Sequence, residues 1–104
     1  MLTPLVRQDD TVRLLEAASE PVRLGIVFLL GGAGRMNVGD IATRFPRISR
    51  PAISHHLRVL REAGMVHSER TGQEIHYWLD RDRVVSGLRS LADAIEACCP
   101  PSQG

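Results

Sequence analysis

The residues with the clearest chemistry in this chain are hydrogen-bond donors concentrated in positions 49–61. Apolar Ile53, Leu57 and Leu60 recur at i, i+4 and i+7, which predicts a helix with one face docked on a core. A solvated amphipathic helix would show the same periodicity. Arginine, serine and histidine side chains on the opposite face can donate to DNA phosphates and base edges. The segment therefore predicts a helix that reads DNA, through Arg50, Ser54, His55, Arg58 and Arg61.

Positive charge is concentrated around the same segment. The 104-residue chain has a formal net charge of only +1, yet residues 43–61 contain five arginines and no acidic residue. A cationic patch on a nearly neutral body is the electrostatic footprint expected of a specific DNA-binding protein. All 13 cationic side chains are arginine, which excludes Schiff-base and P-loop chemistry because both depend on lysine.

Local signals predict how this helix is bounded and positioned. Ser49 suits the N-cap, Pro51 suits the first turn, and Gly64 ends the helix as a C′ glycine, so we expect a helix over residues 49–63. Residues 38–45 predict a shorter helix, joined by a turn at residues 46–48, which makes a helix–turn–helix.

Two strand-like runs follow the helix, at residues 66–70 and 74–79. They flank Thr71, Gly72 and Gln73, which predicts a β-hairpin. A helix–turn–helix followed at once by a hairpin is a winged helix. The DNA contacts that we predict from this arrangement are Arg44, Arg47, Ser49, Arg50, Ser54, His55, Arg58, Arg61, Arg70 and Gln73.

Outer helices complete the predicted fold. The first opens at Asp9 and Asp10, the second covers residues 22–30 and is apolar enough to be buried, and the last runs from Asp80 or Asp82 to about Cys98. Residues 31–34 contain three glycines and predict a flexible loop. A phosphate cradle is the alternative for this loop, but it lacks a following helix N-terminus and a Lys-Ser/Thr pair.

Length and composition indicate one globular domain, 43% hydrophobic and 24% charged. We expect an N-terminal arm (residues 1–8), a winged-helix domain (residues 9–99) and a C-terminal tail (residues 100–104). The fold class is mainly α, with about five helices and a two-stranded antiparallel wing. The longest apolar stretch, residues 24–30, is too short to span a bilayer, and no secretory signal is legible. We therefore expect a cytoplasmic protein without a membrane partner, and with reduced cysteines.

Three motifs resemble the ArsR/SmtB family of bacterial winged-helix repressors. They are Ala18-Ser19-Glu20-Pro21-Val22-Arg23, Val38-Gly39-Asp40-Ile41-Ala42, and the run from Ser49 to Val66, and the wing segment 70–79 accompanies them. The resemblance covers roughly residues 9–97. It implies a homodimer, built on the first and last helices, that binds an inverted-repeat operator in double-stranded DNA near its own promoter. By matching positions, Arg50, Ser54 and His55 would read bases. One additional residue separates Phe45 from Ser49, which departs from the family pattern in the turn.

The last helix independently favours a dimer. Its apolar residues recur at +4, +3, +4 and +3, from Val84 to Cys98, which gives a stripe wide enough to pack on a partner. The alternative is that the stripe packs on its own domain. The interface residues that we predict are Leu15, Val84, Leu88, Leu91 and Ile95.

We predict neither a metal site nor a cofactor. The positions that match the family's Cys-Val-Cys thiolate site are Asn37-Val38-Gly39. Carboxylates reproduce the spacing of the family's last-helix zinc site, one residue out of register and without imidazole, which suits zinc poorly (Asp80, Asp82, Asp93 and Glu96). His67 and His76 lie on the two wing strands. A two-residue turn would make them neighbours, a three-residue turn would place Tyr77 opposite His67, and ordinary strand residues are the better interpretation.

The adjacent Cys98 and Cys99 are the candidate thiol sensor. Soft thiolates suit arsenite and similar thiophilic inducers, and an intersubunit redox switch is a further alternative. The contrary interpretation is a helix end in which Cys98 continues the apolar stripe and Cys99 has no role.

The leading functional hypothesis is a homodimeric, sequence-specific DNA-binding repressor. A winged-helix module for protein–protein contact is the alternative from another class, but such a face would mix charge signs and carry aromatics. No nucleophile–base pair, metal triad or cofactor loop supports an enzyme.

Overall fold

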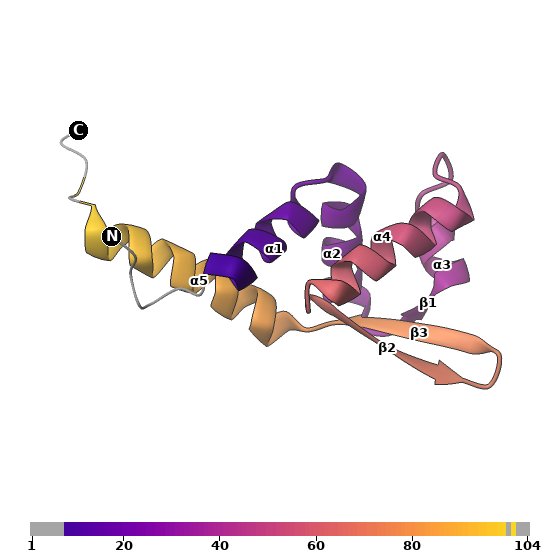
Figure 1. The fold of residues 1–104 in the computed structure, drawn as a ribbon. Coiled ribbons are helices and arrows are strands. Elements are labelled where there is room, and N and C mark those ends of the chain that lie inside the picture. The colour runs from indigo at the N-terminus through magenta and orange to yellow at the C-terminus, as the bar shows by residue number, and fades with distance from the viewer. Residues whose placement is uncertain (1–7, 100, 102–104) are drawn as a thin grey trace.

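The computed structural model describes residues 8–99 and residue 101. Apart from Gln8 and Pro101, the predicted N-terminal arm and C-terminal tail lie outside the described residues. The elements follow in the order α1 (Gln8–Ala18), α2 (Pro21–Ala33), β1 (Met36–Asn37), α3 (Val38–Thr43), α4 (Arg50–Glu62), β2 (Val66–Thr71), β3 (Glu74–Leu79) and α5 (Arg81–Cys98). The predicted fold class, a mainly helical winged helix, is confirmed (Figure 1).

Capping residues explain where α2 begins and ends. The Glu20 carboxylate accepts hydrogen bonds from the backbone N–H groups of Val22 and Arg23, both at 3.0 Å. The helix continues beyond the predicted 22–30, and the loop predicted at residues 31–34 is wrong. Gly31 and Gly32 are helical, and the helix ends at Gly34, whose positive φ of 82° is costly for other residues.

The helix–turn–helix forms as predicted, with small differences at its ends. Asn37 caps α3 by accepting from the Asp40 N–H at 2.8 Å, and α3 ends at Thr43 rather than residue 45. Ser49 caps α4 by accepting from the Ala52 N–H at 3.2 Å, and Gly64 has a φ of 77° just beyond its end. Each of these signals is local in the sequence, which is why residues 49–63 could be predicted closely.

The wing is a three-stranded antiparallel sheet in the order β1-β3-β2, one strand more than predicted. The strand β2 extends one residue beyond the predicted 66–70, because Thr71 pairs with Glu74 and only Gly72 and Gln73 lie between them; the turn therefore has two residues, one of the two lengths considered. This register places His67 opposite Trp78, and therefore opposite neither His76 nor Tyr77. The strand β1 has two residues, too few to show an alternating pattern.

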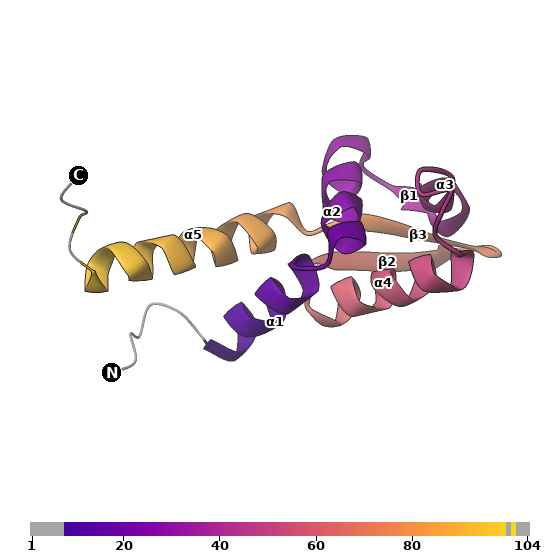
Figure 2. The same ribbon diagram turned by 90° about the horizontal axis from the view of Figure 1, so that it is seen from above.

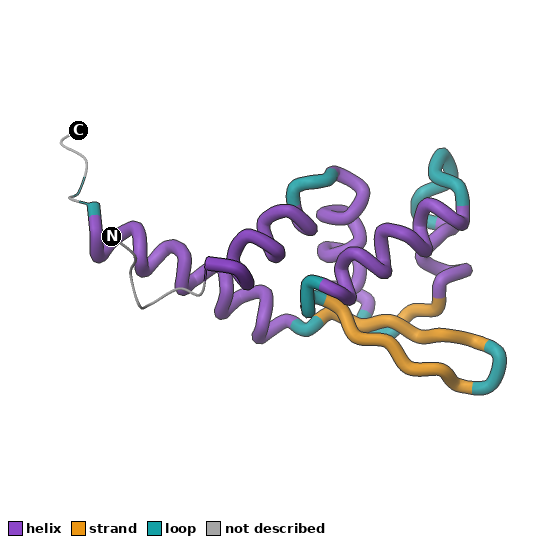
Figure 3. Tube along the Cα trace, in the orientation of Figure 1, coloured by secondary structure: helices purple, strands orange, loops and turns teal. Residues whose placement is uncertain are grey.

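The core lies among α2, α3 and α4, where Ile26, Ile41, Ile53, Leu57 and Leu60 are fully buried. Figure 2 shows α1 and α5 extending from this core on the side opposite the wing tip, and Figure 3 shows the wing as the strand-built part of the molecule. None of the helices within residues 8–99 combines the length and the apolar content that a bilayer crossing requires.

The helices α1 and α2 are each buried on one side only. In α1 the buried side chains are Leu14 and Ala17. The prediction that α2 is buried holds for Ile26, Val27 and Leu30, but Leu24 and Phe28 are 42% and 72% exposed. The helix α2 is therefore only partly buried, and its other side is exposed although it is apolar.

Candidate nucleic-acid interface

Four of the predicted DNA contacts on α4 line a groove between this helix and the wing. Ser54, His55, Arg58 and Arg61 face β3 across a space of about 420 Å³. All ten predicted DNA contacts are exposed to solvent. The predicted set on α4 is therefore brought together with the wing on one accessible surface.

Several of these donors are held by neighbours on the same surface. The Arg58 guanidinium lies 3.3 Å from His55 Nδ1, and Arg61 Nη1 donates to Ser68 Oγ on β2 at 3.3 Å. Arg61 therefore connects the end of α4 to the wing. Because the bonds are exposed and single, exchanging them for phosphate oxygens costs little.

Arg50 and Ser49, which were also predicted to contact DNA, do not line this groove. The Arg50 guanidinium lies over Gly39 in α3, with its nitrogens 3.8 and 3.9 Å from the place that a Cβ would occupy there. A larger side chain at position 39 would crowd it. Ser49 Oγ already accepts the capping bond from Ala52 N–H. Contacts of either residue with DNA stay predictions.

Two wing residues in this groove were missed by sequence reasoning. Ile75 and Tyr77 alternate along β3 and line the groove together with Pro51 of α4. Their period-two spacing is visible in the sequence, but which strand face meets α4 depends on the register of the sheet. Arg70 and Gln73 lie further out, in β2 and in the turn.

A second exposed surface lies on α1 and α5 and is apolar. Its members Val12, Leu15, Leu88 and Ile95 are between 42% and 52% exposed. The two helices pack closely, because a Cβ on Gly87 would lie 2.8 Å from the Leu14 side chain. Of the remaining predicted interface residues, Leu91 is half-buried, whereas Val84 is only 8% exposed and packs in the core of its own domain.

The residues considered for sensing are placed as follows. Cys98 and Cys99 are exposed at the end of α5, with their sulfur atoms 3.4 Å apart. The shared hydrogen bond with Cys98 raises the pKa of the Cys99 thiol, so it carries less thiolate at neutral pH. Within residues 8–99 and 101, no three side chains of the types that bind metals come together.

The carboxylate of Asp80, one of those at the spacing of the family's zinc site, has a structural role. It caps α5 by accepting from the Arg83 N–H at 3.1 Å, and its other oxygen lies 2.7 Å from His67 Nε2. These two hydrogen bonds, with His67 contributing most, lower the pKa of Asp80. This contact between β2 and the start of α5 was not predicted, because the two residues lie on different elements.

Comparison with known proteins agrees with this geometry. Residues 20–68 match the family model described as bacterial regulatory protein, arsR family. The transcriptional repressor SdpR of Bacillus subtilis is 46% identical over 67 residues, which are 64% of this chain and 72% of that protein.

Two solved structures extend the comparison. The crystal structure of a possible transcriptional regulator for arsenical resistance is 44% identical, with a TM-score of 0.70 over 79% of this chain and 82% of that one. A homodimeric winged helix-turn-helix DNA-binding domain from Mycobacterium bovis, solved by NMR, is 25% identical, with a TM-score of 0.69 over 86% of this chain and 83% of that one. Sequence and structure therefore agree that the chain belongs to the arsR family of bacterial regulatory proteins.

Proposed function

We propose that this chain is a transcriptional repressor that binds an inverted-repeat operator in double-stranded DNA as a homodimer. The observation that carries the proposal is the grouping of Ser54, His55, Arg58 and Arg61 along one open groove beside the wing. Support comes from the relatives: SdpR is named a transcriptional repressor, and the Mycobacterium bovis domain is described as homodimeric and DNA-binding.

The physical account of recognition divides the surface by chemistry. Arg50, Ser54 and His55 on α4 would enter the major groove and reach base edges, as recognition helices do, and Arg58 lies beside them. Arg44 and Arg47 lie before α4, and Arg70 lies in β2, so they would contact phosphates on either side. These contacts orient the helix without adding sequence information.

The dimer half of the proposal rests on the apolar surface of α1 and α5. Exposed apolar side chains that gather on one surface mark interaction sites in soluble proteins. A two-fold axis through this surface would present two α4 helices to successive major grooves, which an inverted repeat requires.

Selection from a random duplex library, followed by fluorescence anisotropy at two salt concentrations, tests the proposal. We expect an inverted repeat to be enriched, and affinity to fall steeply as salt rises because phosphate contacts release counterions. Arg58→Ala should reduce affinity for the selected duplex far more than Arg89→Ala, an equal charge change on the exposed side of α5. Equal affinity for selected and scrambled duplexes would show DNA binding without sequence specificity, and binding to neither would favour the protein–protein module.

A further inference from the structure

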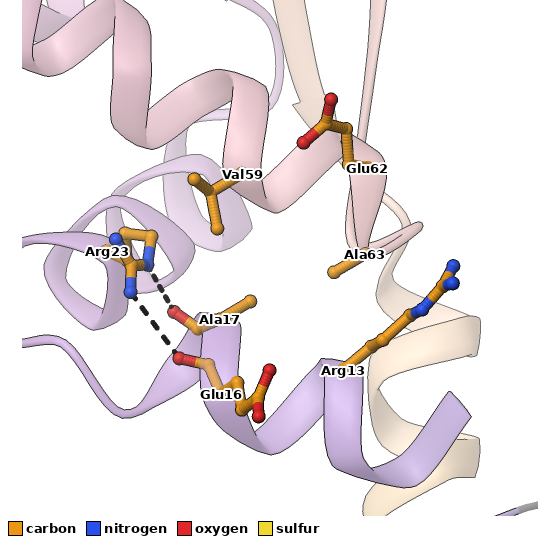
Figure 4. Close-up of a pocket in the computed structure, with 7 residues that line it drawn as sticks. All are labelled: Arg13, Glu16, Ala17, Arg23, Val59, Glu62 and Ala63. Carbon is orange, nitrogen blue, oxygen red and sulfur yellow. Dashed lines mark hydrogen bonds between the residues drawn. The ribbon is translucent and has the colours of Figure 1, made fainter. Parts of the chain in front are cut away.

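The Arg23 side chain of α2 connects three helices. Its Nε donates to the Ala17 carbonyl at 2.7 Å, and its Nη2 reaches the Glu16 carbonyl at 3.4 Å, as Figure 4 shows. Both carbonyls belong to the last turn of α1, where backbone acceptors have no partner within the helix. On its other side, Nη1 lies 3.1 Å from His56 Nδ1 on α4.

His56 completes the connection on the inner side of α4. Its side chain is 15% exposed, and the same Nδ1 lies 3.4 Å from Glu20 Oε2. A guanidinium can only donate, so a hydrogen bond from Arg23 to Nδ1 uses the neutral imidazole with its proton on Nε2. Nδ1 then does not donate to Glu20, whose carboxylate oxygens accept from the N–H groups of Val22 and Arg23. Burial favours that neutral form and lowers the pKa of His56; Arg23 and His55 act in the same direction, and Glu20 opposes them.

The space beside this connection is open. A cavity of about 650 Å³ separates α1 from the second half of α4, with Ala17, Val59 and Ala63 among its lining residues (Figure 4). The Arg23 guanidinium forms part of the wall of this space. Direct contact between α1 and α4 is limited, and the hydrogen bonds of Arg23 add a polar connection between the two helices.

We propose that Arg23 is a positioning residue that holds the recognition helix α4 at a set orientation to α1, and thereby selects the spacing of the two DNA half-sites. The inference rests on the proposed function, in which α1 contributes to the dimer and α4 reads DNA. A planar guanidinium suits the task because its donors point in fixed directions, so one side chain ties the end of α1 to one face of α4.

The test compares selected operators that differ in spacing. One inserted base pair moves the half-sites apart by about 3.4 Å and rotates them by about 35°. Wild type should bind the selected duplex at least about tenfold more tightly than the lengthened one. Arg23→Met should reduce this ratio to about twofold or less, because α4 then adopts a range of orientations to α1.

The matched control is Arg13→Met, since Arg13 lines the same cavity and the change in charge is the same. In the described part of the chain, its side chain has no hydrogen bond to another residue. We expect Arg13→Met to keep the wild-type ratio. A role of Arg23 in stability alone would lower the active fraction for both duplexes equally and leave the ratio unchanged.

A second pair of variants tests the connection without changing Arg23. His56→Leu removes the acceptor on α4 and should lose the spacing preference, whereas His56→Asn keeps an acceptor near the position of Nδ1 and should retain most of it. An unchanged ratio in folded Arg23→Met or His56→Leu would overturn the inference. If selection enriches no inverted repeat at all, the proposed function fails first, before any spacing can be compared.

Discussion

The two exposed surfaces of this molecule differ in how well each tolerates water. The α4 and wing surface carries charged and polar side chains that are already partly paired, as Arg61 is with Ser68. The α1 and α5 surface carries apolar side chains that are about half exposed, such as Ile95 at 52%. Water solvates the first surface and is unfavourable at the second. We therefore expect a dimer that persists in the absence of DNA, and DNA binding that is reversible and sensitive to salt.

The largest effect should come from placing charge on the apolar surface. Leu88→Asp with Ile95→Asp should give a folded monomer, because both side chains are exposed in the single chain but would be buried in the dimer. Losing one of two linked half-sites should weaken operator binding by about 100-fold or more. Analytical ultracentrifugation and circular dichroism measure the assembly and the fold.

Ser86→Asp with Ala97→Asp is the control for this variant. Both residues are exposed on the opposite side of α5, and the double change adds the same charge. We expect this protein to remain a dimer. An intact dimer in Leu88→Asp/Ile95→Asp would show that the apolar surface is not the interface.

The next largest effect should come from removing the Arg50 side chain at the start of α4. Arg50→Ala should weaken specific binding by about 1–3 kcal/mol and relax the preference at one base position in each half-site. The side chain lies beside Gly39 of α3 in the structure and is exposed to solvent. Anisotropy titrations with operators changed one base at a time measure the effect, and an equal loss on random duplexes would restrict Arg50 to phosphate contact.

The helix α4, the wing and the contact between Arg23 and His56 differ in how far the sequence predicts them. The residues of α4 could be identified because its caps, its periodicity and its polar face all lie within one short segment. The register of the wing, which brings Ile75 and Tyr77 to the groove, depends on strand pairing across a turn whose length the sequence left open. Arg23 and His56 are 33 residues apart, and no local pattern relates them.

A smaller effect, on the stability of the fold, should appear when pH is lowered and His56, the partner of Arg23 on α4, is protonated. The pKa of His56 in the folded protein is lowered, chiefly by burial, so the unfolded chain takes up the proton first as pH falls. Stability is therefore greatest above the ordinary histidine pKa of about 6.5 and declines as pH falls through it toward the lower folded value. Burial raises the pKa of Glu20, but the N–H groups of Val22 and Arg23 outweigh this and lower it, so further stability is lost at more acidic pH.

Thermal melting followed by circular dichroism measures this dependence. Between about pH 7.5 and pH 5.5, wild type should lose a few degrees of Tm more than His56→Asn does. The comparison isolates His56 because the other histidines are common to both proteins. An identical loss in the two proteins would show that His56 is not the group responsible.

The smallest expected effect is at the far end of α5. Zinc, cobalt and nickel at micromolar concentration should leave the protein–operator complex intact, because the residues described by the structure bring together no set of metal-binding side chains. A response to arsenite or a mild oxidant should require Cys98 and Cys99, whose sulfur atoms are 3.4 Å apart and exposed.

The raised pKa of Cys99 limits the thiolate available at neutral pH, so we expect this response to be weak and to increase with pH. A ligand bridging thiols of two α5 helices would change operator affinity only by binding one dimer arrangement better than another. Arsenite added to the complex should therefore release wild type partially and leave Cys98→Ser/Cys99→Ser bound. Equal release of the two proteins, or of neither, would show that Cys98 and Cys99 are not a sensor and that the proposed role of α5 is dimerisation alone.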